Sequence, residues 1–138
     1  MRAVTRGFLD LLESKNIKYS IVREDAEKND YITVSSKADK MQSMTLSFFI
    51  DDNDICVKVF GVANVPEEKK PTVLNALNEL HKKYRWVTFF IDEEEEVVAQ
   101  IDSKFKSNES APELFWELLL RAYDIVNDSY PEIMKSIW

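Results

Sequence analysis

The sequence predicts an α+β fold in which helices pack on an antiparallel sheet of five to six strands. Apolar residues recur at helical spacing in three segments, and six short segments carry β-favouring residues, several of them in alternation. Most connections are short, which permits antiparallel pairing and not the longer crossovers of a parallel sheet. The 138 residues suffice for one hydrophobic core, so we expect a single domain, residues 1–138, with the order α-β-β-β-β-α-β-β-α.

The first half of the chain is expected to hold one helix and four strands. The helix is predicted over residues 3–15, because Val4, Phe8, Leu11 and Leu12 fall on one helical stripe. A short polar segment, Asp51 to Asp54, predicts a hairpin between the last two strands. The four strands are predicted over residues 19–24, 31–35, 44–50 and 55–60.

The second half is expected to hold a helix, a second hairpin and a long C-terminal helix. Pro66 or Pro71 is predicted to begin the middle helix, because proline suits a first helical turn. The hairpin is predicted to join strands 87–91 and 97–101 through an acidic turn. Ser110 and Glu113 predict a capping box at the start of the last helix. Pro131 is expected to end or kink that helix and to leave residues 131–138 as a short amphipathic segment.

Composition restricts the class of partner and the compartment. The chain has 25 acidic and 18 basic residues, a net charge of -7, and this balance disfavours binding to nucleic acid. No apolar run approaches the roughly 20 residues of a membrane span, so we expect no membrane partner. The single Cys56 excludes an intramolecular disulfide. With no signal-like segment at the N-terminus, a cytoplasmic location is expected.

The region around the middle helix resembles the YbjN family, whose members are described as bacterial sensory-transduction regulators. The similarity covers residues 3 to 130 approximately and is clearest from Val65 to Ile101. The matching features are Val65-Pro66-Glu67-Glu68, Leu77-Asn78 with Leu80, and Arg85-Trp86 at the start of a strand.

The resemblance implies a fold like that of the type III secretion chaperones, in which helices lie against an antiparallel sheet and the protein is often dimeric. It implies no reaction and no catalytic residues. His81 stands where the family commonly has a second asparagine, and the turn from Glu93 to Glu96 is more acidic than usual.

Catalytic and metal-binding motifs are weak in this sequence. The acidic segments Asp51–Asp54 and Asp92–Glu96 lack the spaced ligands and glycine of a calcium loop. Two glycines in the whole chain leave no glycine-rich phosphate loop. A hydrolase that uses Cys56 and His81 is the weakest hypothesis, since it requires these two single residues to be adjacent. We therefore expect no enzyme, no cofactor and no metal.

An excess of apolar residues is the strongest indication of function. The C-terminal helix has an apolar arc near twice the width that packing on one sheet requires, with Trp116 and Tyr123 within it. If alternate strand residues face the helices, several aromatic residues face away from them: Phe49, Phe60, Trp86 and Phe90. Surplus apolar surface usually marks an interface. The alternative is that the segment from Ile133 to Trp138 folds back and covers it.

Two functional hypotheses follow. The first is a non-enzymatic protein-interaction or chaperone-like module, a homodimer that holds segments of a still unidentified protein partner on these six aromatic residues. The second is a small-ligand sensor with a pocket between the C-terminal helix and the sheet, lined by Trp116 and Tyr123 with Asn78 or His81 as polar anchor. For Asn75 and Asn78, a structural hydrogen bond to the neighbouring strand is favoured over a bond to a partner.

Overall fold

A computed structural model describes all residues from Met1 to Trp138, and its six strands form one sheet. The strand order is β1-β2-β3-β4-β6-β5, and every neighbouring pair is antiparallel. The expected α+β class and order of elements are confirmed. The elements are α1 (Ala3–Ser14), β1 (Ser20–Glu24), β2 (Asp30–Lys37), β3 (Ser43–Ile50), β4 (Asp54–Asn64), α2 (Lys70–Lys83), β5 (Thr88–Ile91), β6 (Glu96–Lys104) and α3 (Ala111–Ile137).

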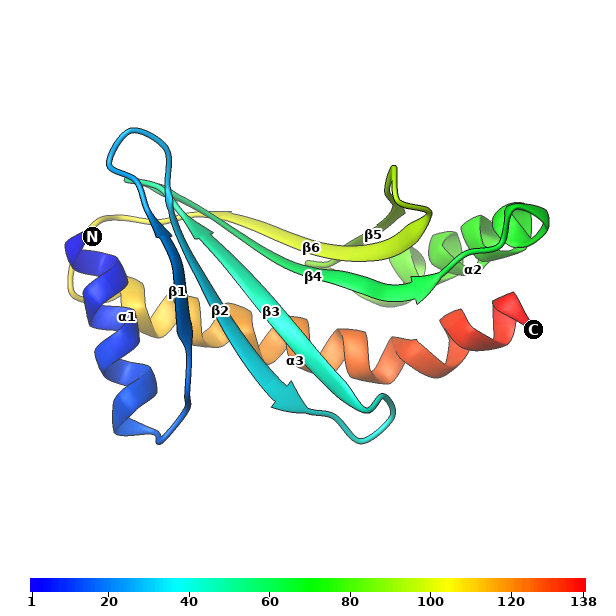
Figure 1. Ribbon diagram of the computed structural model, residues 1–138, viewed down its shortest axis with the longest axis horizontal. Coiled ribbons are helices and arrows are strands. Elements are labelled where there is room, and N and C mark those ends of the chain that lie inside the picture. Colours follow the sequence, from blue (N-terminus) through cyan, green and yellow to red (C-terminus); the bar gives the residue numbers. More distant parts are fainter.

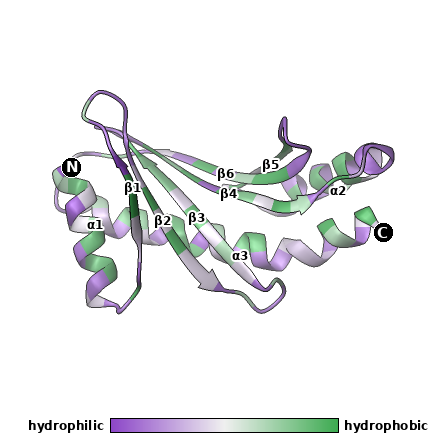
Figure 2. Ribbon diagram, viewed as in Figure 1, coloured by the Kyte–Doolittle hydropathy of each residue, from purple (hydrophilic) through white to green (hydrophobic).

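The three helices share one hydrophobic core with one face of the sheet. Figure 1 shows α3 running along the sheet, with α1 beside its beginning and α2 beside its end. Three phenylalanines join the layers: the Phe8 ring centroid of α1 lies 5.0 Å from that of Phe48 in β3 and 5.7 Å from that of Phe115 in α3. The hydropathy colours of Figure 2 follow this arrangement, with alternating residues along β3. The wide apolar arc of α3 is largely used within the chain, because α3 contacts α1, α2 and the sheet.

The N-terminus of α1 is fixed to the sheet by a buried carboxylate. The Asp30 side chain accepts hydrogen bonds from the Arg2 backbone N–H at 2.9 Å and the Thr5 hydroxyl at 2.7 Å. The Arg2 guanidinium lies 3.3 Å from the other Asp30 oxygen, so the buried charge is paired. A carboxylate at a helix N-terminus also interacts favourably with the helix dipole. These contacts hold α1 against the β2 end of the sheet.

Four strands, β2, β3, β4 and β6, are longer than predicted, because pairing continues past the points where the sequence pattern ends. The predicted strand 55–60 extends to Asn64 as β4, through a register shift against β6 between Val59 and Ala63. Gly61 lies in this shift with φ 60°, a conformation that favours glycine. The strand predicted to begin at Val87 begins at Thr88, two residues after Trp86, whose φ of 80° lies outside the extended region.

Helix ends differ from the predictions in informative ways. Both candidate prolines are used: a single 3₁₀ turn, Glu67–Lys69, follows Pro66, and Pro71 lies in the first turn of α2. The capping box is wrong, because the Ser110 side chain caps no helical N–H and instead donates to the Asn108 side chain at 2.6 Å.

The C-terminal segment does not fold back over the sheet. α3 continues through Pro131 to Ile137, so of the two expected effects of Pro131, an end or a kink, the end is wrong. Burial of Ile133 in the core stabilises the continued helix and offsets the hydrogen bond that proline lacks. The segment lies beside α2, where Lys83 Nζ is 3.4 Å from Glu132, and Trp138 is 82% exposed.

Candidate functional surface: the uncovered face of the sheet

The face of the sheet opposite the helices carries a row of three aromatic side chains from neighbouring strands. Phe49 in β3 pairs with Tyr31 in β2, and their ring centroids are 4.3 Å apart. Phe60 in β4 continues the row, with its centroid 6.4 Å from that of Phe49 in an edge-to-face arrangement. We call Tyr31, Phe49 and Phe60 the aromatic patch. Phe60 remains 48% exposed although its ring packs against that of Phe49.

Two cations border the aromatic patch. Lys58 Nζ lies 5.7 Å from the ring centroids of both Phe49 and Phe60, and the Arg23 guanidinium lies 5.7 Å from the Tyr31 ring. Neither Lys58 nor Arg23 forms an ion pair with a carboxylate. Cations at this distance stabilise exposed aromatic faces by about 0.5–1 kcal/mol each. The patch is therefore apolar at its centre with Lys58 and Arg23 at its rim, while three aspartates line the hollow beside Phe49: Asp51, Asp54 and Asp102.

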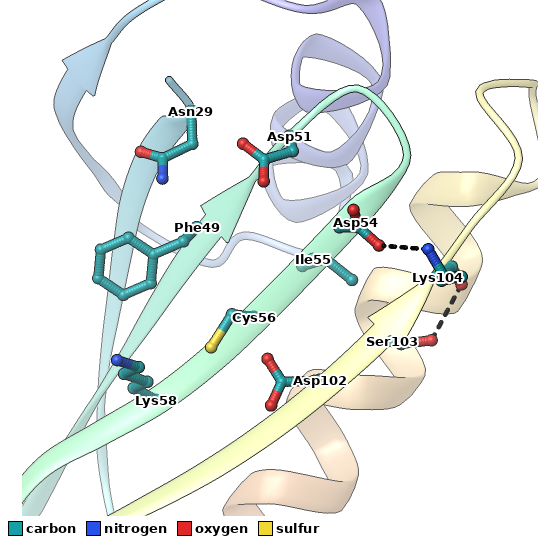
Figure 3. A pocket seen from close by; sticks show the side chains of 10 residues that line it. All are labelled: Asn29, Phe49, Asp51, Asp54, Ile55, Cys56, Lys58, Asp102, Ser103 and Lys104. Atoms are coloured by element: carbon teal, nitrogen blue, oxygen red, sulfur yellow. Dashed lines mark hydrogen bonds and ion pairs between the residues drawn. The ribbon is translucent and has the colours of Figure 1, made fainter. Parts of the chain in front are cut away.

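A hollow of about 570 Å³ adjoins the aromatic patch and contains Cys56. The register places Phe49, Cys56 and Asp102 side by side across β3, β4 and β6, as Figure 3 shows. Burial first, and a hydrogen bond to Asp102 second, together raise the pKa of the Cys56 thiol from 9.0 to about 12. A thiol in this state is a poor nucleophile at neutral pH.

His81 is not part of that hollow and has a structural partner. Its Nε2 accepts a hydrogen bond of 2.9 Å from the Phe89 backbone N–H, which joins α2 to edge strand β5. The sequence predicted such a bond to the strand but assigned it to Asn75 or Asn78, both of which are exposed. The structure thus keeps His81 apart from Cys56 and provides no Cys-His pair.

The six predicted partner-binding residues fall in four places. Phe49 and Phe60 belong to the aromatic patch, which also contains Tyr31, a residue that sequence reasoning missed. The missing signal was register: alternation in the segment YITVS shows which face Tyr31 takes, but only strand pairing places it beside Phe49. Phe90, half-buried, lies on β5 and lines a groove along α2 that also includes Asn78 and His81.

Trp86 lies on the helix side and not on the uncovered face, so that prediction is wrong. The positive φ of Trp86 turns its side chain out of the strand pattern, and its ring lies 5.0 Å from the Arg121 guanidinium of α3. It lines a hollow of about 640 Å³ beside α3 together with Leu120 and Asp124.

Trp116 and Tyr123 do line one hollow, of about 480 Å³, which we call the α3 notch. Its other walls are the connection between α1 and β1 and the last residues of β2. The predicted polar anchors, Asn78 or His81, lie in the separate groove between α2 and β5, so neither lines the α3 notch. A hydrogen bond of 2.8 Å from the Tyr123 hydroxyl to the Lys37 carbonyl fixes the edge of the notch.

No three His, Cys, Asp or Glu side chains gather closely enough to hold a metal ion. None of the helices has both the length and the apolar character needed to cross a membrane.

The architecture defines an α+β class in which helices cover one face of a six-stranded antiparallel sheet and leave aromatic side chains on the other. The chain belongs to the YbjN family: the family model, described as "Putative bacterial sensory transduction regulator", matches residues 9–133.

A solved structure has a similar fold. It is that of YbjN from E. coli, described as "a putative transcription regulator", with a TM-score of 0.62 over 94% of this chain and 92% of that chain. The sequences are 12% identical, so this likeness concerns the fold alone. No curated protein matches this chain in sequence.

Proposed function

We propose that the protein is a non-enzymatic, cytoplasmic regulatory module that binds a segment of another protein on the aromatic patch. The observation that carries this proposal is the uncovered position of Tyr31, Phe49 and Phe60, which no helix and no terminal segment covers. Tyrosine and arginine are among the residues that most often dominate binding energy, and phenylalanine is enriched at interfaces. Membership of a family of regulators supports a binding role.

The proposal includes a homodimer. Edge strand β1 exposes two apolar side chains, Ile21 at 44% and Val22 at 56%, and these support a contact between two copies along this edge. A register shift between Ile21 and Arg23 bends this edge and limits open-ended strand pairing. Light scattering after size-exclusion chromatography at tens of micromolar tests the dimer, and a monomer at that concentration contradicts this part of the proposal.

The binding role is tested with two aspartate variants of matched exposure. Phe60→Asp changes the aromatic patch at a side chain that is 48% exposed, and Leu74→Asp changes α2 at one that is 50% exposed. Proteins captured from a lysate of the source bacterium are identified by mass spectrometry for wild type and both variants. We expect Phe60→Asp to weaken capture of a specific partner at least about tenfold, as for a central interface aromatic, while Leu74→Asp retains it. Equal capture by folded Phe60→Asp would contradict the proposal.

A further inference from the structure

The α3 notch lies on the side of the sheet opposite the aromatic patch and exists because strand pairing stops early. The ladder between β1 and β2 ends at the pair Ser20 and Thr33. β2 continues to Lys37, so its last four residues have a strand partner on the β3 side alone. In an antiparallel sheet, alternate residues direct their N–H and C=O groups to each side, so this segment presents main-chain polar groups at the rim of the notch.

The interior of the notch is apolar. Val34 of β2 and Leu46 of β3 form the floor and belong to the core. Trp116 and Leu120 of α3 form a wall, and Leu120 is 42% exposed although its neighbour Leu119 is buried. A hollow of about 480 Å³ with apolar walls and a few polar groups has the size and character of a small-molecule site.

The charge at the rim differs from that of the rest of the chain. No Asp or Glu lines the α3 notch, whereas each of four other hollows of comparable size has at least one. Lys18 lines the notch, and Lys15 Nζ lies 4.7 Å from the Trp116 ring centroid. Neither lysine forms an ion pair. On a chain of net charge -7, this apolar hollow with lysines at its rim is complementary to an apolar ligand that carries a negative charge.

We propose that the α3 notch binds a small apolar carboxylic acid. The aliphatic or aromatic body lies against Trp116 and Leu120, and the carboxylate accepts hydrogen bonds from Lys18 and from main-chain N–H groups of the unpaired end of β2. Two contacts hold the walls in place before any ligand binds: the bond from Tyr123 to Lys37, and one of 3.0 Å from the Lys40 backbone N–H to the Asn127 side chain of α3. A preformed site avoids much of the ordering cost of binding.

The experiment compares acids with an uncharged analogue of the same length. The probes are octanoate, 3-phenylpropionate and 1-octanol, titrated against the folded protein with detection of the Trp116 indole N–H by NMR. That signal is assigned with Trp116→Phe, because the chain has three tryptophans. We expect at least one acid to shift the signal saturably and to bind at least about tenfold more tightly than 1-octanol, as one charge-assisted contact allows.

Three variants connect binding to the notch. Lys18→Glu is expected to weaken binding of the acid at least about tenfold by reversing the rim charge, whereas Lys135→Glu, the same change near the other end of α3, leaves it unchanged. Leu120→Trp fills the notch from an exposed position and is expected to abolish the titration. Circular dichroism and thermal melting verify that each variant is folded.

Several results overturn the proposal. Equal affinity for octanoate and 1-octanol, or no saturable shift with either acid, contradicts the proposal that the notch binds a carboxylate. If the acids do not bind and Leu120→Trp instead abolishes self-association, the notch is occupied by a second copy. If it instead abolishes capture of a protein partner, a protein segment occupies it. The aromatic patch is tested by Phe60→Asp on the opposite face, so failure of the ligand proposal is distinguishable from failure of the proposed function.

Discussion

The two faces of the sheet use neighbouring residues of the same strand for opposite purposes. Phe48 points into the core and is fully buried, with its ring against Phe8 of α1. Phe49, the next residue along β3, points to the uncovered face and packs with Tyr31 and Phe60. One face is covered by three helices, and the other carries a comparable aromatic side chain with no covering element.

The difference teaches that aromatic content alone does not identify the core of this protein. On the covered face, apolar residues of adjacent strands are continuous from β2 to β6. On the uncovered face, polar residues lie between the aromatic rings and one end of the sheet. Ser35 of β2 pairs with Thr45 of β3, and their hydroxyl groups are 2.8 Å apart. The aromatic patch is therefore a local cluster on a mixed surface, as expected of a recognition site.

The largest expected effect is the loss of stability in Phe48→Ala. Removing a fully buried phenylalanine side chain leaves a cavity between α1 and β3 and typically costs about 3–5 kcal/mol. Phe49→Ala, which shortens the same residue type one position later, is expected to cost about 1–2 kcal/mol, because the ring is half-buried and loses mainly aromatic contacts. Urea unfolding followed by circular dichroism measures both. Equal losses would show that the uncovered face belongs to the structural core.

This contrast also marks the limit of what the sequence predicts. Alternation along β3 assigned Phe48 to the helix side and Phe49 to the other, and the structure agrees, because strand geometry fixes alternation locally. Trp86 was assigned by the same rule and was wrong, since its positive φ ends the alternation before the strand begins. Partners across strands, such as Tyr31 for Phe49, depend on register, which no local pattern specifies.

The same limit applies to helix α3 and its surroundings. Its wide apolar arc was interpreted as a surplus for an interface, whereas much of it contacts α1 and α2 within the chain. The continuation of α3 through Pro131 could not be predicted from the local sequence either, because burial of Ile133 depends on where α3 lies relative to the core. The α3 notch depends on the point at which β1 leaves β2, which is a property of the folded sheet.

An intermediate loss of stability is expected when the hydrogen bond between α2 and edge strand β5 is removed. His81→Ala removes the acceptor for the Phe89 N–H and is expected to destabilise the protein by about 1–3 kcal/mol, the usual cost of an unsatisfied, partly buried donor. His81→Asn retains a side-chain acceptor and is expected to lose less. Thermal melting measures the stability, and amide hydrogen exchange at Phe89 reports the bond itself. Equal losses in the two variants, with unchanged exchange at Phe89, would contradict this role.

The smallest expected effect concerns the protonation of Cys56 on the uncovered face, which changes stability little at neutral pH. Its pKa of about 12 in the folded protein, against 9.0 for an ordinary thiol, keeps it protonated while the unfolded chain begins to ionise. The raised pKa therefore contributes stability below pH 9 that is lost as the pH rises toward 12.

At pH 8 the folded thiol should react with iodoacetamide at least about a hundredfold more slowly than the urea-unfolded chain, since the thiolate is the reactive form. Burial is the main cause of the raised pKa and the hydrogen bond to Asp102 is the next. Asp102→Asn removes the carboxylate charge and is expected to accelerate labelling, whereas Asp39→Asn, an exposed carboxylate in the connection between β2 and β3, leaves the rate unchanged. Rapid labelling of the folded wild type would show that the uncovered face is more open around Cys56 than its burial beside Phe49 and Asp102 indicates. Cys56 would then be a reactive thiol in the folded protein.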